Sequence, residues 1–349
     1  LLKMLANYND GGDREDDKAK TGGYKPKLIV PVAEAGELVR IMEKHAANAA
    51  IQLYACGLIQ NIGFKPAYAA KLVGAKKAIL LTMTKQGSSS SIGALANLTS
   101  AIYDAKGGDK KDFDDCVGPV VKTMQAHKAD AGVQEQGCAA LLSLTYLHPV
   151  NQNAVAKAKG IDVIVAAMKT HKNSDKCQRN ACGALLNLST DNAKNKKEIV
   201  SSGGIASIIT AMKAHADNVN VQLEGCSVLY NLSQSLDRLL VEKAGAKAVI
   251  DAALKAHKKN GALVFKANAA LDALAGTGGG TTDSDPKSSS KVITDKSAKA
   301  VATGTKVIKL GDKAGTKATT ASTKAIKAGD KAVTKATTSS AGTKAIKAG

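Results

Sequence analysis

The sequence has no tryptophan and only three Phe and seven Tyr among its 349 residues. Because 44% of the residues are hydrophobic, a core has to be built from Ala, Leu, Ile, Val and Met, which favours helices over a β-sandwich. No run approaches the roughly 18 apolar residues of a membrane span, and no charged-then-apolar leader opens the chain. The sequence therefore predicts a soluble protein with no transmembrane segment, located in the cytoplasm and/or the nucleus.

Cysteine is also sparse, and the charge is strongly unbalanced. The six cysteines are too few for a disulfide scaffold and form no CxxC pair, so a reducing compartment is expected. The formal net charge is +19, which favours polyanionic partners such as nucleic acid, acidic peptide or anionic lipid.

Composition divides the chain into three segments. Residues 1–27 are polar and Gly-rich and are expected to form a flexible N-terminal segment. Residues 28–275 carry a periodic hydrophobic pattern. Residues 276–349 form a low-complexity tail rich in Lys, Thr, Ala and Gly, with 14 Lys against 5 Asp. This tail lacks the large apolar side chains that would support a core, so we expect it to be disordered.

A repeat organises the middle segment. Five copies of a helix-like hexapeptide, such as TAMKAH, end on a histidine that defines a His slot: His45, His127, His171, His215 and His257. The eleventh residue after each histidine defines a Cys slot, filled by Cys56, Cys138, Cys182, Cys226 and, in the last copy, Asn268. A sixth, damaged copy places Gln86 in the His slot and has a shortened loop. The His slots recur every 41 to 44 residues, a period typical of stacked helical repeats.

Each unit is predicted to be helical. Apolar residues precede the His215 slot at i, i+3, i+4 and i+7 spacing, at Ile205, Ile208, Ile209 and Met212, which is one face of a helix. A second apolar face follows the polar turn KAHADNVN. A shorter helix is expected before both, ending at the corner formed by Gly203 and Gly204. Three helices in about forty residues, stacked in register, make an α-solenoid.

The pattern GGIASIITAMKAHADNVNVQLEGCSVLYNLSQ resembles the armadillo repeat of β-catenin, importin-α and the vacuolar and leucine-rich-repeat-kinase armadillo proteins. The resemblance rests on the Gly-Gly corner, the Val-Gln that opens the third helix and the Leu-x-Asn-Leu near its end. It covers roughly residues 28–275. It implies an all-α, right-handed α-solenoid of about six armadillo repeats, which acts as a non-enzymatic scaffold for protein partners without a cofactor.

The His and Cys slots are interpreted as structural. Zinc ligands must converge to about 2.0–2.3 Å from one ion, whereas equivalent side chains of stacked helices lie about 8–10 Å apart. We therefore expect the cysteines to pack in the core and the histidines to close a turn. Small residues before each Cys slot would let the third helix approach its neighbours. His171, Cys177 and Cys182 lack a fourth ligand, so no zinc site is predicted, and no Ser, His, Asp arrangement or carboxylate pair indicates catalysis.

The candidate binding residues are the asparagines of Leu-x-Asn-Leu. This Asn slot holds Asn in four units and Ser143 and Ala273 in the other two; the asparagines are Asn61, Asn97, Asn187 and Asn231. In armadillo proteins the matching asparagines line the concave face and hold the backbone of an extended peptide, for which an amide offers both a donor and an acceptor. The alternative is that these asparagines tie neighbouring turns together.

Four residues before the Asn slot lies what we call the floor slot, where importin-α-like grooves carry Trp. Here it holds only small residues, Gly57, Gly93, Ala139, Gly183, Ser227 and Ala269. Without these aromatics, and with a basic body, a basic localisation signal is a poor ligand, and an acidic or neutral extended segment fits better. No clear basic stripe on this face is evident from the sequence.

A second hypothesis concerns the tail. Its lysines could bind nucleic acid or another polyanion by counterion release, although no interleaved aromatics support base stacking. The sequence leaves the oligomeric state and the partner's identity open.

Overall fold

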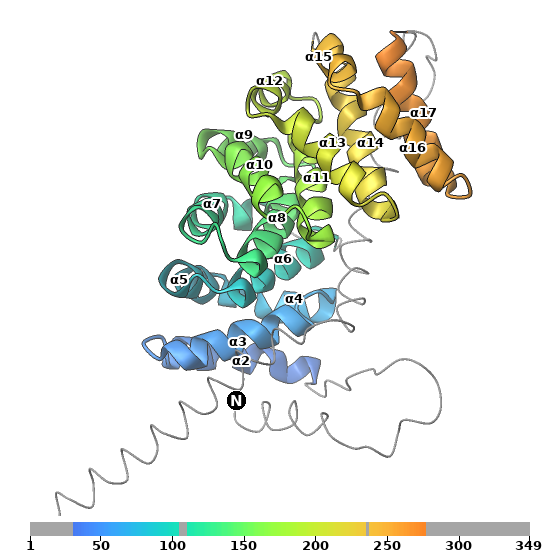
Figure 1. The fold of residues 1–349 in the computed structure, drawn as a ribbon. Coiled ribbons are helices and arrows are strands. Elements are labelled where there is room, and N and C mark those ends of the chain that lie inside the picture. The colour runs from blue at the N-terminus through green and yellow to red at the C-terminus, as the bar shows by residue number, and fades with distance from the viewer. Residues whose placement is uncertain (1–30, 105–109, 235–236, 277–349) are drawn as a thin grey trace, which may run out of the picture. The chain divides into compact units, whose positions relative to one another are not determined.

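The computed structural model describes residues 31–104, 110–234 and 237–276, and within these ranges all regular secondary structure is helical. The helices fall into units of first, second and third helices (Figure 1). The first helices are α4 (Pro66–Leu72), α9 (Pro149–Lys157), α12 (Ala193–Ser201) and α15 (Arg238–Lys243). The second helices are α2 (Ala35–Lys44), α5 (Lys76–Gln86), α7 (Val117–Ala126), α10 (Gly160–Thr170), α13 (Gly204–Ala214) and α16 (Ala246–Ala256).

The third helices are the longest elements of most units, and they are α3 (Ala49–Ile62), α6 (Ser89–Asp104), α8 (Ala131–Thr145), α11 (Asp175–Ser189), α14 (Val219–Ser233) and α17 (Gly261–Ala275). Short 3₁₀ helices occupy Val32–Glu34, Val73–Ala75 and Lys110–Phe113. The six predicted units are all present, including the damaged one, whose second and third helices are α5 and α6. Residues 28–30 of the predicted solenoid, the predicted N-terminal segment (residues 1–27) and the predicted tail apart from Gly276 lie outside the described residues.

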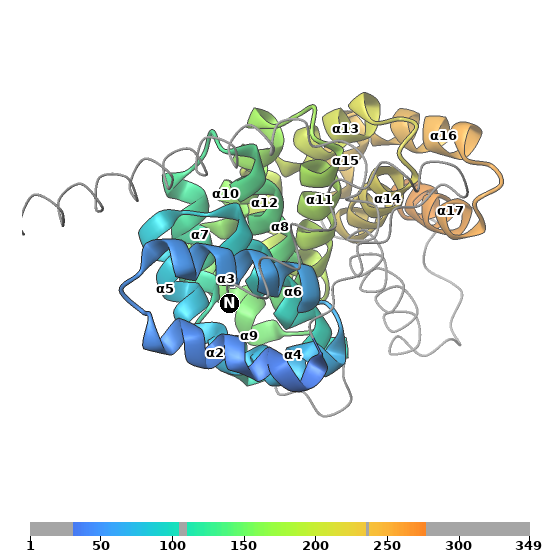
Figure 2. The ribbon, with the colours of Figure 1, turned by 90° about the horizontal axis from the view of Figure 1, so that it is seen from below.

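The units stack through their third helices. The most extensive contacts between elements join α3 to α6, α6 to α8, α8 to α11, α11 to α14 and α14 to α17. Figures 1 and 2 show these helices as one continuous row, with the first and second helices stacked along its other side. The fold is the predicted right-handed α-solenoid. It places the same position of successive third helices side by side.

The core is aliphatic, as the composition requires. Phe113 is the one aromatic residue among the largest fully buried side chains. The small residues before the Cys slots have the expected role, because a Cβ on Gly137 would lie 2.4 Å from Cγ of Met124, and one on Gly225 would lie 2.7 Å from Cγ of Met212. In each of these units a methionine side chain of the second helix therefore packs directly against the backbone of the third helix.

The corner between the first and second helices needs a left-handed residue. Gly203 has φ 81° and Gly245 has φ 87°, a region that glycine enters at little cost. The predicted corner at Gly203 is confirmed. Lys159 takes the same place in the preceding unit with φ 61°, so this repeat tolerates a strained residue where its neighbours use glycine.

Candidate functional site: the third-helix row and the ties between repeats

The slot histidines end the second helices and reach the neighbouring repeat. Each described slot histidine is the C-terminal capping residue of its second helix, and its backbone N–H donates to the carbonyl four residues earlier. The imidazole Nε2 atoms of His171 and His215 lie 2.8 Å from the carbonyl oxygens of Lys128 and Lys172, and that of His257 lies 2.7 Å from the carbonyl oxygen of Ala216. In each case the acceptor directly follows the His slot of the preceding unit.

The turn role predicted for histidine is thus confirmed, but its side chain acts between repeats. The unit that precedes His127 has Gln86 in its His slot. There, a Cβ on Gly87 would lie 1.9 Å from His127 Nε2. The His127 ring therefore packs on the left-handed Gly87 that follows the damaged slot. His45, in the first described unit, is exposed.

Buried glutamines of the third helices donate hydrogen bonds to the C-terminal ends of the second helices. The seventh residue after four of the histidines is glutamine. Its Nε2 donates to two backbone carbonyls at the C-terminal end of the second helix, where the last carbonyls have no intrahelical donor. Gln178 reaches the oxygens of Met168 and His171, both at 3.0 Å. The same pair of bonds recurs at Gln52, Gln134 and Gln222. In two of these units the glutamine belongs to the Val-Gln pair of the repeat pattern, at Gln134 and Gln222.

The third helices are capped three residues after the His slot. The side-chain oxygens of the cap residues accept a hydrogen bond from the first-turn backbone N–H of the third helix. These residues are Asn48, Asp130, Ser174, Asn218 and Asn260. The eight residues from the His slot to the glutamine thus hold a complete helix-to-helix connection.

The slot cysteines are packing residues with unreactive thiols. Cys56, Cys138, Cys182 and Cys226 are all fully buried. Burial raises the pKa of the Cys56 and Cys226 thiols to about 12. The pKa of Cys138 is raised by a hydrogen bond with the Cys177 thiol and by burial. Such thiols stay protonated at neutral pH, and a thiolate is the form that attacks or binds metal.

No group of three or more His, Cys, Asp or Glu side chains within the described ranges could hold a metal ion. The set formed by His171, Cys177 and Cys182 is not brought together as ligands, because both cysteines are buried in α11 whereas the His171 ring is bonded to the turn at Lys128. The sixth histidine, His148, lies outside the slots. Its Nε2 lies 2.8 Å from Asp114 Oδ1, linking the start of α9 to the segment before α7.

The predicted groove asparagines form a ladder between third helices. The Nδ2 of Asn97 donates to the carbonyl oxygen of Gln60 (2.6 Å), and that of Asn187 to the carbonyl oxygen of Leu142 (2.8 Å). Asn231 donates to Ser189 Oγ at 3.0 Å and Thr190 Oγ1 at 3.2 Å. The tie between neighbouring turns, one of the two roles inferred from sequence, is therefore present in three units.

These ties use only part of the hydrogen-bonding capacity of each amide, and Asn97 and Asn187 are themselves buried. Asn97 and Asn187 each use one of two N–H donors in these bonds, and an amide also has a carbonyl acceptor. Asn231 is half-buried, and Asn61 is exposed. The peptide-binding role of the four asparagines stays a prediction.

Neighbouring side chains cover two of the floor slots, at Gly93 and Gly183. A Cβ on Gly93 would lie 2.2 Å from Nε2 of Gln60, and one on Gly183 would lie 3.1 Å from Cδ1 of Leu142. Side chains of the preceding unit therefore fill the space that an aromatic residue would need. The atoms nearest to both glycines belong to side chains, and the same slot holds Ala or Ser in three other units, so the stacking favours a small residue there.

Charge on the third-helix row is sparse and mixed. Among the described residues the third helices carry only three basic side chains, Lys176, Arg179 and Lys266. The buried Glu224 of α14 interacts electrostatically with both Arg179 of α11 and Lys266 of α17. Burial lowers the pKa of Lys266 to about 8, which Glu224 partly opposes.

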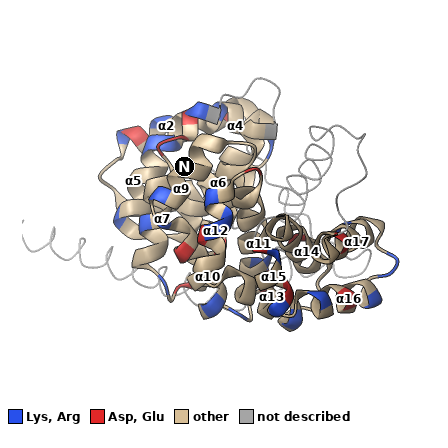
Figure 3. Cartoon of the chain, turned by 90° about the horizontal axis from the view of Figure 1, so that it is seen from above, with Lys and Arg blue, Asp and Glu red and all other residues tan. Residues whose placement is uncertain are grey.

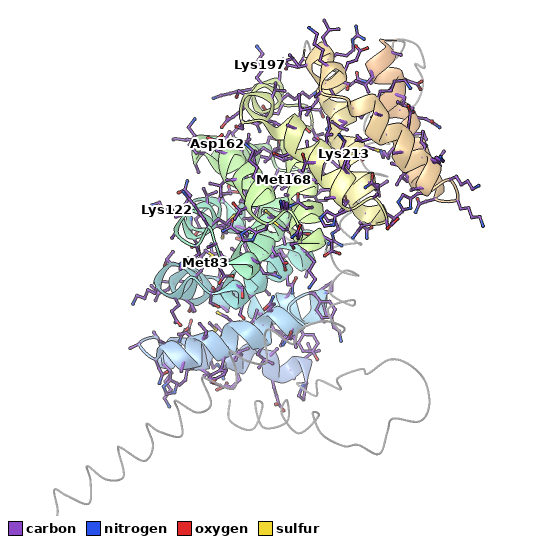
Figure 4. All side chains as sticks on the ribbon, viewed as in Figure 1. Met83, Lys122, Asp162, Met168, Lys197 and Lys213 are labelled. Atoms are coloured by element: carbon purple, nitrogen blue, oxygen red, sulfur yellow. The ribbon has the colours of Figure 1, made fainter. Side chains whose placement is uncertain are left out.

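The basic excess lies instead on the outer helices. In Figure 3 the blue Lys and Arg positions lie on the first and second helices, interspersed with red acidic positions. In Figure 4 the labelled Lys122, Lys197 and Lys213 project from α7, α12 and α13, and all three are exposed, whereas Met83 and Met168 are buried in the core. The chain thus presents a nearly neutral third-helix row and a basic outer surface.

These features define an armadillo-type α-solenoid. Three-helix units, a glycine corner and an asparagine ladder recur in register along the described residues. The profile of the LRRK2 ARM repeat family matches residues 36–309. The chain belongs to this armadillo-repeat family, and the match runs beyond Ala275, where the sequence predicted the tail to begin.

Comparison of the fold with solved structures gives the same class. An engineered protein matches with a TM-score of 0.59 and 20% identity, over 70% of this chain and 98% of its own. The designed armadillo repeat protein YIII(Dq)4CqI matches with a TM-score of 0.56 and 16% identity, over 69% and 100%. The designed protein YIII(Dq.V1)4CPAF, in complex with the peptide (KR)4, matches with a TM-score of 0.54 and 17% identity, over 69% and 99%. No curated protein sequence matches the chain.

Among the described helices, none is long and apolar enough to cross a lipid bilayer.

Proposed function

We propose that the chain is a non-enzymatic scaffold that binds an extended segment of a protein partner along the third-helix row. One observation carries the proposal: four of the five third helices from α3 to α14 hold a side-chain amide at the same position, and only α8, with Ser143, lacks it. A repeated donor and acceptor at one helical height suits the repeated peptide groups of an extended chain. The designed armadillo protein solved with (KR)4 supports a peptide as the ligand class.

The row favours an acidic or neutral segment over a basic one. The floor slots carry no aromatic residue that could pack on lysine stems, and those at Gly93 and Gly183 are covered by neighbouring side chains. Arg179 and Lys266 lie on either side of Glu224 along the row, so two cations share one carboxylate. An acidic side chain of the ligand would add a partner for the guanidinium and the ammonium. Buried thiols with raised pKa values agree with a function without nucleophilic chemistry.

Affinity capture from cell extract, followed by mass spectrometry, tests the proposal with matched variants. The test protein carries Asn187→Ala and Asn231→Ala, and the control carries His171→Ala and His215→Ala, which also loses two ties between repeats but not on the third-helix row. Two lost peptide contacts of about 1 kcal/mol each would weaken binding roughly thirtyfold. We expect partners to be lost from the Asn variant and kept by the His variant. Equal recovery from both would refute the groove.

Binding of nucleic acid or another polyanion through the tail is the alternative function inferred from the sequence. It depends on residues 276–349, which apart from Gly276 lie outside the described residues. Salt-dependent binding to DNA by the full chain, compared with a chain ending at Ala275, separates the two functions. Retained affinity after truncation would exclude the tail as the binding element.

A further inference from the structure

The outer face of α3 has the form of a third-helix contact without its neighbour. The contact between α8 and α11 shows what such a face normally does. Three residues of α11 face α8: Asn180 donates to the Glu135 carbonyl oxygen at 3.1 Å, Gly183 lies under Leu142, and Asn187 donates to the Leu142 carbonyl oxygen.

The three equivalent residues of α3 are Tyr54, Gly57 and Asn61. Tyr54 is 41% exposed, whereas its counterpart Asn180 is 7% exposed. A Cβ on Gly57 would meet no atom within 4 Å. Asn61 is exposed, although its counterparts Asn97 and Asn187 both donate to the preceding helix.

Gly57 lowers the stability of α3 relative to a residue with a side chain. Glycine inside a helix is about 1 kcal/mol less favourable than alanine. At Gly93 and Gly183 this cost has a reason, since the side chains of Gln60 and Leu142 occupy the space that a Cβ would need. At Gly57 no described residue occupies it. The space that a side chain of the preceding third helix fills at Gly93 and Gly183 is therefore open at Gly57.

The chain contains a further copy of that helix pattern ahead of the described residues. Leu5-Ala6-Asn7 repeats Leu95-Ala96-Asn97 of α6, and Met4 and Tyr8 are apolar at the positions of Ala94 and Leu98. Asn7 would thus occupy the Asn slot, and Ala6 the position before it, which in α3 and α8 is held by the residues that cover the glycines, Gln60 and Leu142. The extra length between Asn7 and α2 falls in the Gly- and Asp-rich stretch NDGGDREDD.

We propose that the outer face of α3 is a docking site for one more third helix, supplied by residues 1–9 of the same chain. Ala6 would lie over Gly57, and Asn61 would donate to the carbonyl oxygen of Ala6. Lys3 would hold the floor slot, where the other units have small residues, on the face of the helix turned away from α3. The proposal replaces the flexible segment expected for this stretch, and it does not depend on peptide binding.

A second copy of the chain is a poorer occupant. The face that a copy would offer is the outer face of α17, where Asn268 replaces the buried Cys of the other units and Asp272 takes the position of Leu142 and Leu186. Both residues are exposed. An aspartate over Gly57 would bring a carboxylate to a position where α3 and α8 present the uncharged side chains of Gln60 and Leu142, and removing a charge from water is costly.

Paired cysteines test the register of docking in the full-length chain. The test pair is Ala6→Cys with Gly57→Cys. The positive control is Gln60→Cys with Gly93→Cys, which is the same pair of positions one contact further along. The negative control is Ala6→Cys with Ala262→Cys on the exposed start of α17. The native cysteines are all buried, so mild oxidation followed by mass spectrometry reports on the introduced pairs.

We expect the 6–57 pair to form an intrachain disulfide in a yield similar to that of the 60–93 pair, and the 6–262 pair to stay reduced. A 6–57 yield no higher than that of the negative control overturns the proposal. Disulfides found only between chains also overturn it, in favour of a second copy.

Hydrogen exchange gives an independent readout if the cysteine variants fold poorly. Leu5→Asp should speed amide exchange in α3 several-fold, while Lys3→Asp, which changes the face turned away from α3, should leave it unchanged. Unchanged exchange in Leu5→Asp, or equal effects of the two substitutions, contradicts docking.

Discussion

The imidazole Nε2 of His215 lies 2.8 Å from the backbone carbonyl oxygen of Lys172, at the turn of the preceding repeat. The two residues are 43 positions apart in the sequence, and the same bond recurs at His171 and His257. The histidine and cysteine of the repeat, which could be taken for a catalytic or metal-binding pair, thus have structural roles. The histidine fixes one repeat to the next, and the cysteine packs inside the row.

Removing the hydrogen bond between His215 and Lys172 should lower the stability of the solenoid modestly. In His215→Ala the Lys172 carbonyl loses its partner at a half-exposed site, so we expect a loss of about 1 kcal/mol in the free energy of unfolding. Urea denaturation followed by circular dichroism measures it. His45→Ala is the matched control, because His45 is exposed in the first described unit. Equal losses in both variants would show that the bond to the neighbouring turn contributes nothing.

Losing a slot glutamine should cost more. Gln178→Leu leaves the carbonyls of Met168 and His171 without their buried donor, and an unsatisfied buried polar group costs about 1–3 kcal/mol. We expect a loss of about 2 kcal/mol or more by urea denaturation. Gln234→Leu, at an exposed position after α14, serves as the control and should change stability little. A Gln178→Leu protein as stable as this control would mean that the helix end is satisfied by water.

Glycine before the Cys slot should be intolerant of even one methyl group. In Gly225→Ala the new Cβ would lie 2.7 Å from both Cγ and Sδ of Met212, which is 1% exposed and has little room to move. Overpacking of this kind costs about 1–3 kcal/mol. Gly118→Ala, where a Cβ meets nothing within 4 Å, should cost nothing. Thermal melting of the two variants compares them, and a neutral Gly225→Ala would show that α13 and α14 can separate freely.

Lys266 should make stability rise with pH. Its pKa is lowered to about 8 in the folded chain, so the unfolded chain binds more protons between about pH 8 and the ordinary lysine pKa of about 10.4. Stability therefore increases with pH across this window. Lys266→Met should be more stable than wild type at pH 7.5, and the difference should shrink by pH 10. Melting temperatures at both pH values measure it, and a difference that does not change with pH contradicts the lowered pKa.

The repeat itself could be predicted from the sequence because its signals are local. The histidine frame, the apolar spacing around Ile205 and Met212, and the corner at Gly203 each depend on neighbours within one or two turns. The small residue before Cys226 was also correctly assigned to close packing. These features recur with each unit, so one interpretation applied to all of them.

The ties between units could not be predicted, because they depend on the stacking geometry. Neither the acceptor of His215 nor that of Asn187 is near in sequence, and each is a backbone carbonyl, which leaves no mark on residue identity. The cover that Leu142 gives to Gly183 is hidden for the same reason. Gln178 and its counterparts differ, since glutamine recurs at one spacing after the His slot and could have been identified as a helix-closing residue.

Hydrogen exchange of the chain with and without a captured partner tests the central claim most directly. Binding along the third-helix row should slow amide exchange in α8, α11 and α14 and leave the second helices α10 and α13 unchanged. Slowed exchange in α10 and α13, with none in α11 or α14, would contradict the account and place the partner on the basic outer surface instead.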